Sequence, residues 1–323
     1  MKISIALCTF NGEKFLGEQL ASFESQIRPP DELVVCDDVS TDNTKEILRS
    51  FAVRAPFPVR LVFNEHNLGL VKNFEKAISL CEGDVICLSD QDDVWNSDKL
   101  LLVEQSFLSA DDIGMVYADA DVVTENLLST GTTMWQCINF NRRKQRKFRE
   151  NEAIDCLLKD GCVLGSSMAF RRKYIDQILP IPLDIYFVHD NWIALIVAAV
   201  SRIYIIEKPL MKYRQHSNQS SSGVRPHSRA NLSQAWTASK SSNTYESVIR
   251  QIDILQSRIA SEQVSLYMKQ KITSARQHLE LRSHLPKNIL RRIMQVIPEY
   301  SRGNYRSFSN GIRSAMKDIY RFS

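Results

Sequence analysis

The sequence predicts an α/β fold, with a mostly parallel sheet flanked by helices and followed by a C-terminal helical extension. Two observations lead to the sheet and its helices: short apolar runs alternate with helix-length segments through the first 125 residues, and polar residues gather directly after these runs. A third observation, a change of charge near residue 225, indicates the extension.

The expected strands are short runs rich in Val, Ile and Leu, at 3–9, 32–37, 59–64, 84–89 and 114–122. The expected helices lie between them, at 13–25, 42–53, 69–80 and 97–108. In the first helix, apolar side chains recur at helical spacing. Ser40 or Thr41 is expected to cap the second helix and Ser97 the fourth. Strict alternation of strand and helix implies parallel crossover units.

Polar loops follow four of the expected strands, at 9–12, 37–42, 64–69 and 89–95. A single pair of aspartates after a strand is usually a helix cap. Four such loops are different, because the carboxyl ends of parallel strands meet at one edge, where ligands of such sheets bind. The sequence therefore predicts a binding site at this edge.

The clearest indication of a functional site is a cluster of three carboxylates, Asp90, Asp92 and Asp93. Carboxylates so close together repel one another unless a cation neutralises them or they share protons. Oxygen ligands favour hard ions, so the expected cofactor is Mg²⁺ or Mn²⁺. The alternative is a solvated acidic turn before the next helix. The chain lacks GxxxxGK[ST] and GxGxxG, which argues against a P-loop ATPase and a dinucleotide-binding domain.

Composition sets further limits. Apolar residues make up 44% and charged residues 24% of the 323, close to globular averages, which excludes a disordered or fibrous chain. The seven cysteines contain no CxxC pair and are expected to be reduced core residues. Apolar runs shorter than a membrane span and a start without a signal sequence predict a cytoplasmic protein.

The charge is unevenly distributed. Residues 226–323 hold 16 Lys and Arg against 6 Asp and Glu, whereas residues 1–225 hold 25 against 31. The expected organisation is a catalytic domain at 1–225 and a basic helical extension at 226–323. Helices are expected over 245–285, and residues 288–297 are expected to form a short, basic, amphipathic helix. Such a helix suits a membrane interface, but docking onto the catalytic domain or a second subunit stays equally open.

The polar loops together resemble a known family. Thr-Phe-Asn-Gly at 9–12, Asp-Asp-Val-Ser-Thr-Asp-Asn-Thr at 37–44, Asn-Leu-Gly at 67–69 and Asp-Gln-Asp-Asp-Val-Trp at 90–95 resemble inverting family 2 glycosyltransferases of the GT-A fold. Val-His-Asp-Asn-Trp at 188–192 and Tyr-Arg-Gln-His-Ser-Asn at 213–218 resemble its rhamnosyltransferase-like subgroup, which builds bacterial surface polysaccharides. The resemblance covers about residues 1–223. Val39 departs from the usual Gly or Asn, and a β-branched residue disfavours positive φ, so a different turn is expected there.

The resemblance implies roles for individual residues. The residues expected to bind the nucleotide are Thr9, Phe10, Asn11, Asp37 and Asp38. Asp90 and Asp92 would form the DxD pair that meets ribose and metal, with His216 completing the metal shell.

Arg214 and His216 would close over the diphosphate on a flexible loop, although a solvated linker is the alternative. Asp190 would be the catalytic base of the inverting transfer. Its alternative is an ordinary helix-capping role.

The predicted function is metal-dependent transfer of a sugar from a UDP- or dTDP-sugar onto a hydroxyl of a lipid-linked polysaccharide acceptor, as in bacterial surface polysaccharide synthesis. The extension is expected to allow contact with the inner face of the cell membrane. No nucleic acid partner is expected, and oligomer formation stays open.

Two alternatives remain. A nucleotidyltransferase normally has a Gly- and Lys-rich loop that binds phosphate after the first strand, and Asn-Gly-Glu-Lys at 11–14 matches such a loop poorly. A non-enzymatic adaptor with an inactive transferase domain is disfavoured by the intact acidic cluster and Asp190.

Overall fold

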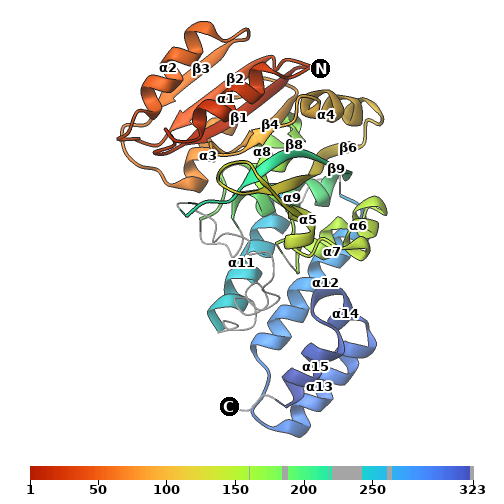
Figure 1. Ribbon diagram of the computed structural model, residues 1–323. Helices are drawn as coiled ribbons and strands as arrows, with labels where there is room; N and C mark the ends of the chain where they lie inside the picture. The colour runs from red at the N-terminus through yellow and green to blue at the C-terminus, as the bar shows by residue number, and fades with distance from the viewer. Residues whose placement is uncertain (160, 184–187, 218, 220–241, 260–263, 321–323) are drawn as a thin grey trace.

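The computed structural model describes residues 1–159, 161–183, 188–217, 219, 242–259 and 264–320. Its centre is a mixed sheet in the order β3-β2-β1-β4-β8-β6-β9-β5, with β7 paired to β6 (Figure 1). The strands are β1 (Ile3–Thr9), β2 (Glu32–Asp37), β3 (Val59–Phe63), β4 (Val85–Ser89), β5 (Val94–Trp95), β6 (Ile113–Val123), β7 (Ser129–Thr133), β8 (Met168–Arg171) and β9 (Arg202–Arg214).

The N-terminal half of the sheet is parallel. β1 pairs with β2 and β4, and β2 pairs with β3, all in parallel. The connecting helices are α1 (Leu16–Glu24), α2 (Thr44–Arg54) and α3 (Leu70–Leu80). The register brings Thr9 beside Asp37 and Leu7 beside Ser89, so the polar loops leave the same edge. The α/β class and the predicted alternation are therefore confirmed.

The C-terminal half of the sheet is not parallel throughout. β8 runs antiparallel to both β4 and β6, while β9 is parallel to β6 and antiparallel to the short strand β5. α4 (Lys99–Leu108) precedes β6. "Mostly parallel" thus describes the first crossover units better than the whole sheet.

The predicted helix caps are wrong. α2 begins at Thr44 after Asn43, and α4 begins at Lys99 after Asp98; in neither case does the cap side chain make a capping hydrogen bond. The Ser40 hydroxyl instead accepts the Asn11 amide, at 2.8 Å. Ser40 is therefore used to join two loops.

The segment between β6 and β9 contains short elements and one buried helix. The short elements are α5 (Met134–Cys137), α6 (Arg142–Arg149), α7 (Ala153–Leu157), the turns η1 (Gly165–Ser167) and η2 (Arg172–Tyr174), and α8 (Ile175–Ile178). The buried helix is α9 (His189–Val200), which is almost wholly enclosed because it packs between the sheet and α7 and α8. Its apolar run is explained by this burial.

Two apolar layers cover the two faces of the sheet. Along β1, Ala6 and Cys8 face one layer, while Ile5 and Leu7 face the other, as alternation along a strand requires. The first layer includes α3 and α9, and the second includes α1, α2 and α4. All seven cysteines are free thiols, and all but Cys137 are buried, in agreement with the prediction of reduced core residues.

The C-terminal region is helical, as predicted, and lies at the far end of the molecule from β1–β3 (Figure 1). It comprises α11 (Ser242–Arg258), α12 (Leu266–Ser283), α13 (Ile289–Ser301), α14 (Asn304–Phe308) and α15 (Ile312–Ile319). Ile252 and Leu255 of α11 join the core of the sheet region. α13–α15 form a small apolar cluster of their own around Val296, Tyr305 and Ala315. The predicted boundary at 225/226 falls outside the described residues.

A buried polar network joins α12 to the helices after it. His278 lies 2.9 Å from Glu299 and 2.8 Å from Ser309, and Arg282 forms an ion pair with Asp318. Tyr305 also donates to Asp318, at 2.9 Å. This end of the molecule is thus held by charge-assisted hydrogen bonds as well as apolar packing. Among the described residues, no helix has the length and apolar character needed to cross a membrane.

Candidate active site

The loops after β1 and β2 are bound to each other through Asp37. Asp37 is fully buried and accepts hydrogen bonds from the Thr9 hydroxyl, at 2.9 Å, and from the Ser40 amide, at 3.0 Å. The Ser40 hydroxyl donates to it as well. Thr9 and Asp37, two of the five residues predicted to bind the nucleotide, therefore form part of the internal framework of this edge.

Asp38 holds the start of α3. Its carboxylate accepts the amides of Leu68, at 2.7 Å, and Gly69, at 2.9 Å, and the side-chain amide of Asn64, at 2.9 Å. The loops after β2 and β3 are thereby fixed together.

Val39 adopts a φ of 67°, in the left-handed region. The expectation of a differently shaped turn is therefore wrong, because the turn keeps a conformation that suits Gly or Asn even though the residue is β-branched. Contacts on either side hold the strained residue, since Asp37 binds Ser40 and Asp38 binds the loop before α3.

Phe10 and Asn11 lie at the rim. The Phe10 side chain is 49% exposed, while its backbone amide and carbonyl are both bound by the side chain of Gln91, at 2.9 Å each. Asn11 accepts the Thr41 amide, at 2.8 Å. A Cβ atom on Gly12 would lie 2.2 Å from Oε1 of Gln91, so a larger residue there would displace the Gln91 side chain that binds Phe10. Phe10 is thus an exposed ring on a fixed backbone.

The loop after β4 carries the acidic cluster. Burial, together with the charges of Asp92 and Asp190, raises the pKa of Asp90 to about 7. Burial also raises the pKa of Asp93, which is fully enclosed. Oδ1 of Asp93 accepts the amide of Arg214, at 3.2 Å, while Oδ2 meets no hydrogen-bond donor among the described residues. The cluster is therefore short of compensating positive charge.

His216 contacts the acidic cluster directly. Its Nε2 atom lies 2.8 Å from Oδ2 of Asp92, and its ring packs on Phe15 with ring centres 4.6 Å apart. Two predicted metal ligands thus lie together. Among the described residues, however, no group of three or more His, Cys, Asp or Glu side chains is arranged to hold a metal ion.

Arg214 ends β9 instead of lying on the loop after it, and its side chain is 2% exposed. Its guanidinium donates to the carbonyls of Asp92 and Glu125 and pairs with Glu18. It also lies 4.7 Å from the centre of the Phe15 ring. Arg214 therefore joins four segments of the site edge, and the expected loop at 220–223 falls outside the described residues.

Asp190 lies in the first turn of α9, after Val188 at the cap position. Burial raises its pKa, opposed by His189 and by the amides of Asn191 and Gly165. His189 stacks on Phe74 with ring centres 4.3 Å apart, and burial lowers its pKa. A Cβ atom on Gly165 would lie 3.2 Å from Nε2 of His189 and 3.4 Å from Cβ of Asp190. The turn η1 therefore closes tightly over Asp190.

Two further polar residues of the site were missed by the sequence analysis. Lys99 is buried in the first turn of α4, where it donates to the carbonyl of Ser166, at 2.8 Å, and lies 3.7 Å from the centre of the Trp95 ring. Burial lowers its pKa to about 7, opposed by nearby acidic groups that include Asp93 and Asp90. Gln91 is the other, and its place inside the acidic motif was the only available signal.

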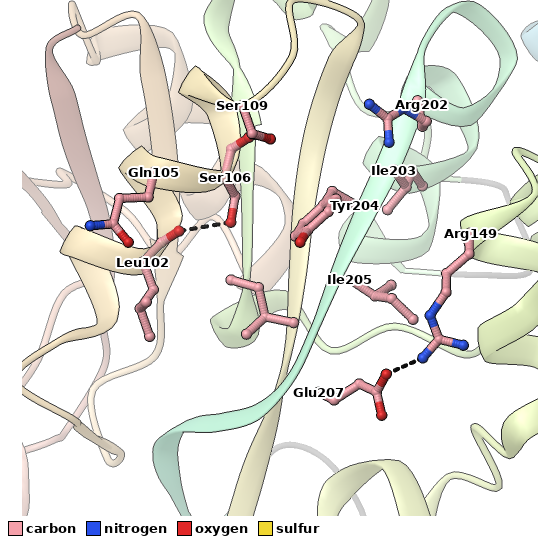
Figure 2. Close-up of a pocket in the computed structure, with 11 residues that line it drawn as sticks. Leu102, Gln105, Ser106, Ser109, Arg149, Arg202, Ile203, Tyr204, Ile205 and Glu207 are labelled. Carbon is pink, nitrogen blue, oxygen red and sulfur yellow. Dashed lines mark hydrogen bonds and ion pairs between the residues drawn. The ribbon is translucent and has the colours of Figure 1, made fainter.

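A cavity of about 520 Å³ lies elsewhere, between α4 and the first half of β9 (Figure 2). None of the predicted site residues lines it. Its two arginines are already paired, Arg149 with Glu207 and Arg202 with Asp112. The candidate active site is therefore the sheet edge that carries the acidic cluster, and not this cavity.

Comparison with curated proteins gives relatives of low identity. An uncharacterised glycosyltransferase of Nostoc sp. is 26% identical over 67% of this chain and 65% of its own length. A dTDP-rhamnosyl transferase, RfbG, of Shigella flexneri is 28% identical over 66% of this chain and 72% of its own length. The chain thus spans less than two thirds of the Nostoc relative.

Two solved structures share the fold. Residues 1–349 of S. aureus TarS, in complex with UDP-GlcNAc, match 99% of this chain and 90% of that one, with 19% identity and a TM-score of 0.60. The mannosyltransferase PcManGT of Pyrobaculum calidifontis, in complex with GDP-Man and Mn²⁺, matches 100% and 88%, with 16% identity and a TM-score of 0.52. These likenesses support the GT-A-type fold.

The sequence model of glycosyl transferase family 2 matches residues 4–179, which contain β2–β4, nearly all of β1, the acidic loop and the turn η2 before α8. This match covers more than half of the chain. The protein belongs to glycosyl transferase family 2.

Proposed function

We propose that this protein is an inverting glycosyltransferase that moves a sugar from a UDP- or dTDP-sugar onto a hydroxyl of a lipid-linked glycan during surface polysaccharide synthesis. Family membership supports the reaction class. The rhamnosyl transferase relative supports a dTDP-sugar, and the UDP-GlcNAc complex of the structural neighbour supports a UDP-sugar. Free thiols suit a reducing compartment, so we assign the reaction to the cytoplasm.

One observation carries the proposal. Asp190, at the start of α9, and Asp90, at the end of β4, lie close enough for the charge of Asp190 to raise the pKa of Asp90. Burial raises the pKa of both carboxyl groups. Carboxyl groups with raised pKa values that meet at the edge of a sheet are typical of acid–base chemistry, because nothing in packing alone requires them there.

Asp190 is the proposed base. Its carboxylate accepts the proton of the acceptor hydroxyl as that oxygen bonds to the anomeric carbon of the donor. The bond from this carbon to the diphosphate oxygen breaks, and the nucleoside diphosphate leaves with the electron pair. A raised pKa improves the base, since efficiency is highest when the pKa is near the working pH.

A divalent cation fits the residues present. Burial and the neighbouring carboxylates raise the pKa of Asp93, and one of its buried oxygens has no donor among the described residues. Asp92 and His216 would hold Mg²⁺ or Mn²⁺, with Asp90 beside them and phosphate oxygens of the donor completing the shell. The ion would neutralise charge on the leaving diphosphate. The Mn²⁺ bound in the mannosyltransferase neighbour supports this assignment.

The nucleotide is assigned to the loops after β1 and β2. Phe10 presents an exposed ring that can stack on the base, and Asn11 lies beside it. Thr9, Asp37 and Asp38 hold the loops in place through the hydrogen bonds described above. Arg214 is assigned the same supporting task, because its donors are engaged by protein groups.

Donor hydrolysis by the purified full chain tests the proposal. UDP-glucose, UDP-GlcNAc, dTDP-rhamnose and GDP-mannose are incubated separately with Mn²⁺, Mg²⁺ or a chelator, and the released nucleoside diphosphate is measured. We expect release from at least one UDP- or dTDP-sugar, dependent on the cation and lost in Asp190→Asn. Absence of release from all donors, together with absence of nucleotide binding, would contradict the proposal.

A further inference from the structure

The two long helices of the C-terminal cluster carry large apolar side chains on their solvent faces. We call these side chains the α13–α15 surface, and they are Ile289, Leu290, Met294, Ile297, Ile312, Met316 and Tyr320. Leu290 is 67% and Met294 75% exposed. Their sequence spacing places them in one stripe along each helix. Such side chains ordinarily pack inward, so this surface calls for an explanation.

The two stripes belong to helices that pack on each other. Val296 of α13 and Ala315 of α15 belong to the buried cluster, whereas the side chains of the stripes are exposed. In Figure 1 the two helices lie side by side at the C-terminal end of the molecule. The apolar surface is therefore not needed to hold the helices together.

The exposed charge around this surface has one sign. Residues 285–320 are all described, and their exposed ionic side chains are cations, namely Lys287, Arg291, Arg302, Arg306, Arg313 and Lys317. The two acidic residues in this range, Glu299 and Asp318, are buried: Glu299 is hydrogen-bonded to His278, and Asp318 forms an ion pair with Arg282. The network described above thus removes negative charge from the surface.

From this arrangement we infer that the α13–α15 surface docks on an anionic lipid bilayer. Apolar side chains enter the boundary between headgroups and acyl chains, while Arg and Lys stay at the phosphate level. A second copy of the same surface would bring cations against cations, which opposes self-association. A nucleic acid would satisfy the charge but leave the apolar side chains in water. An anionic bilayer pairs with the cations and also takes the apolar side chains out of water.

Co-sedimentation of the full chain with vesicles tests the inference. Vesicles of phosphatidylcholine containing about one third phosphatidylglycerol are compared with pure phosphatidylcholine at low and high salt. We expect binding to the anionic vesicles that salt weakens. Replacing two cations, Arg313→Gln with Lys317→Gln, should weaken it roughly ten- to thirty-fold, since each cation near an anionic surface contributes about a factor of five.

A matched control uses another basic helix. Arg142→Gln with Arg143→Gln removes two exposed cations of α6 and should leave binding within about twofold, which separates a specific surface from general attraction by charge. Leu290→Asn with Met294→Asn and Met316→Asn should abolish binding, whereas Val53→Asn with Leu108→Asn, at exposed apolar positions of α2 and α4, should not. Melting curves verify that each variant is folded.

Two outcomes would overturn the inference. Equal sedimentation of the chain and its α13–α15 variants excludes this surface as the docking site. Loss of a dimer in the apolar variant, measured by light scattering without vesicles, assigns the surface to a second copy of the chain instead. Nucleotide binding by the same variants should be unchanged, so the result is independent of the proposed function.

Discussion

Nε2 of His216 lies 2.8 Å from Oδ2 of Asp92, although the two residues are 124 positions apart in the chain. Further contacts hold both residues in place: His216 packs on Phe15, and Arg214 donates to the carbonyl of Asp92. The loop after β4 and the end of β9 therefore hold each other in position.

Asp92→Asn should abolish cation-dependent nucleotide binding and leave the fold intact, because Asn keeps the size of Asp92 but removes one ligand charge. Calorimetry with Mn²⁺ and UDP or dTDP measures the effect. Asp98→Asn, at another acidic position of similar exposure that pairs with Lys208, is the control and should bind normally. Unchanged affinity in Asp92→Asn would rule out this residue as a ligand.

Asp190→Asn should lower kcat by a factor of about 10² to 10⁴, the typical contribution of a general base, with little change in donor affinity. Asp176→Asn is a matched control, since Asp176 also lies in the first turn of a helix but is exposed. A lower melting temperature with normal kcat would instead assign Asp190 a purely structural task.

The pH dependence of kcat gives a separate check on Asp190. A base acts only when ionised, so activity is lost as the pH falls through its pKa. Because burial raises the pKa of Asp190, this loss should occur at higher pH than the value of about 3.9 for a free aspartate. Measuring kcat at a series of pH values gives the midpoint. A midpoint near that of a free aspartate would contradict the assignment.

Val39→Asn should stabilise the protein by about 1 kcal/mol, because Asn adopts a positive φ more readily than a β-branched residue. Denaturant unfolding measures the gain. Val53→Asn, on an exposed face of α2, is the control and should give no gain. Equal effects of both changes would show that the φ of Val39 is not strained.

Stability should fall as the pH is lowered below about 6.5, the pKa of a free imidazole. Burial lowers the pKa of His278 in the folded chain, so the unfolded chain binds the proton more readily in this range. Glu299 acts in the same direction at lower pH, because its pKa is also lowered. Two further charged groups face His278: Arg282 lowers its pKa and Asp318 raises it.

His278→Gln should flatten this pH dependence between pH 7.5 and 5.5, since glutamine hydrogen-bonds but does not titrate. Thermal unfolding of both proteins across this range provides the measurement. Parallel curves for the two proteins would exclude His278 as the group responsible.

The sequence was sufficient to predict the first four strands and the helices between them, because each has a local apolar pattern. It could not predict that β8 inserts between β4 and β6. Met168–Arg171 is a four-residue strand without alternation, and its place depends on pairing with distant strands. The two C-terminal helices over 245–285 were predictable for the same local reason as the first ones.

The site was harder to predict than the fold. The acidic loop and Asp190 stood out through motif order, and their roles stay predictions. Lys99 gave no signal, because a lysine in the first turn of a helix normally lies in water. Arg214 was expected on a flexible loop. The sequence does not show that its side chain contacts Glu18, Glu125 and the loop after β4.

The position of β9 has a consequence for synthesis of the chain. Among the described residues β9 is the last strand in sequence, yet it pairs with both β6 and β5, and Arg214 at its end binds the acidic loop. On the ribosome, the parallel half of the sheet can pair as soon as it emerges, whereas the acidic loop must wait for these distant partners. A nascent chain arrested before β9 is translated would therefore be folded in part but unable to organise its acidic loop.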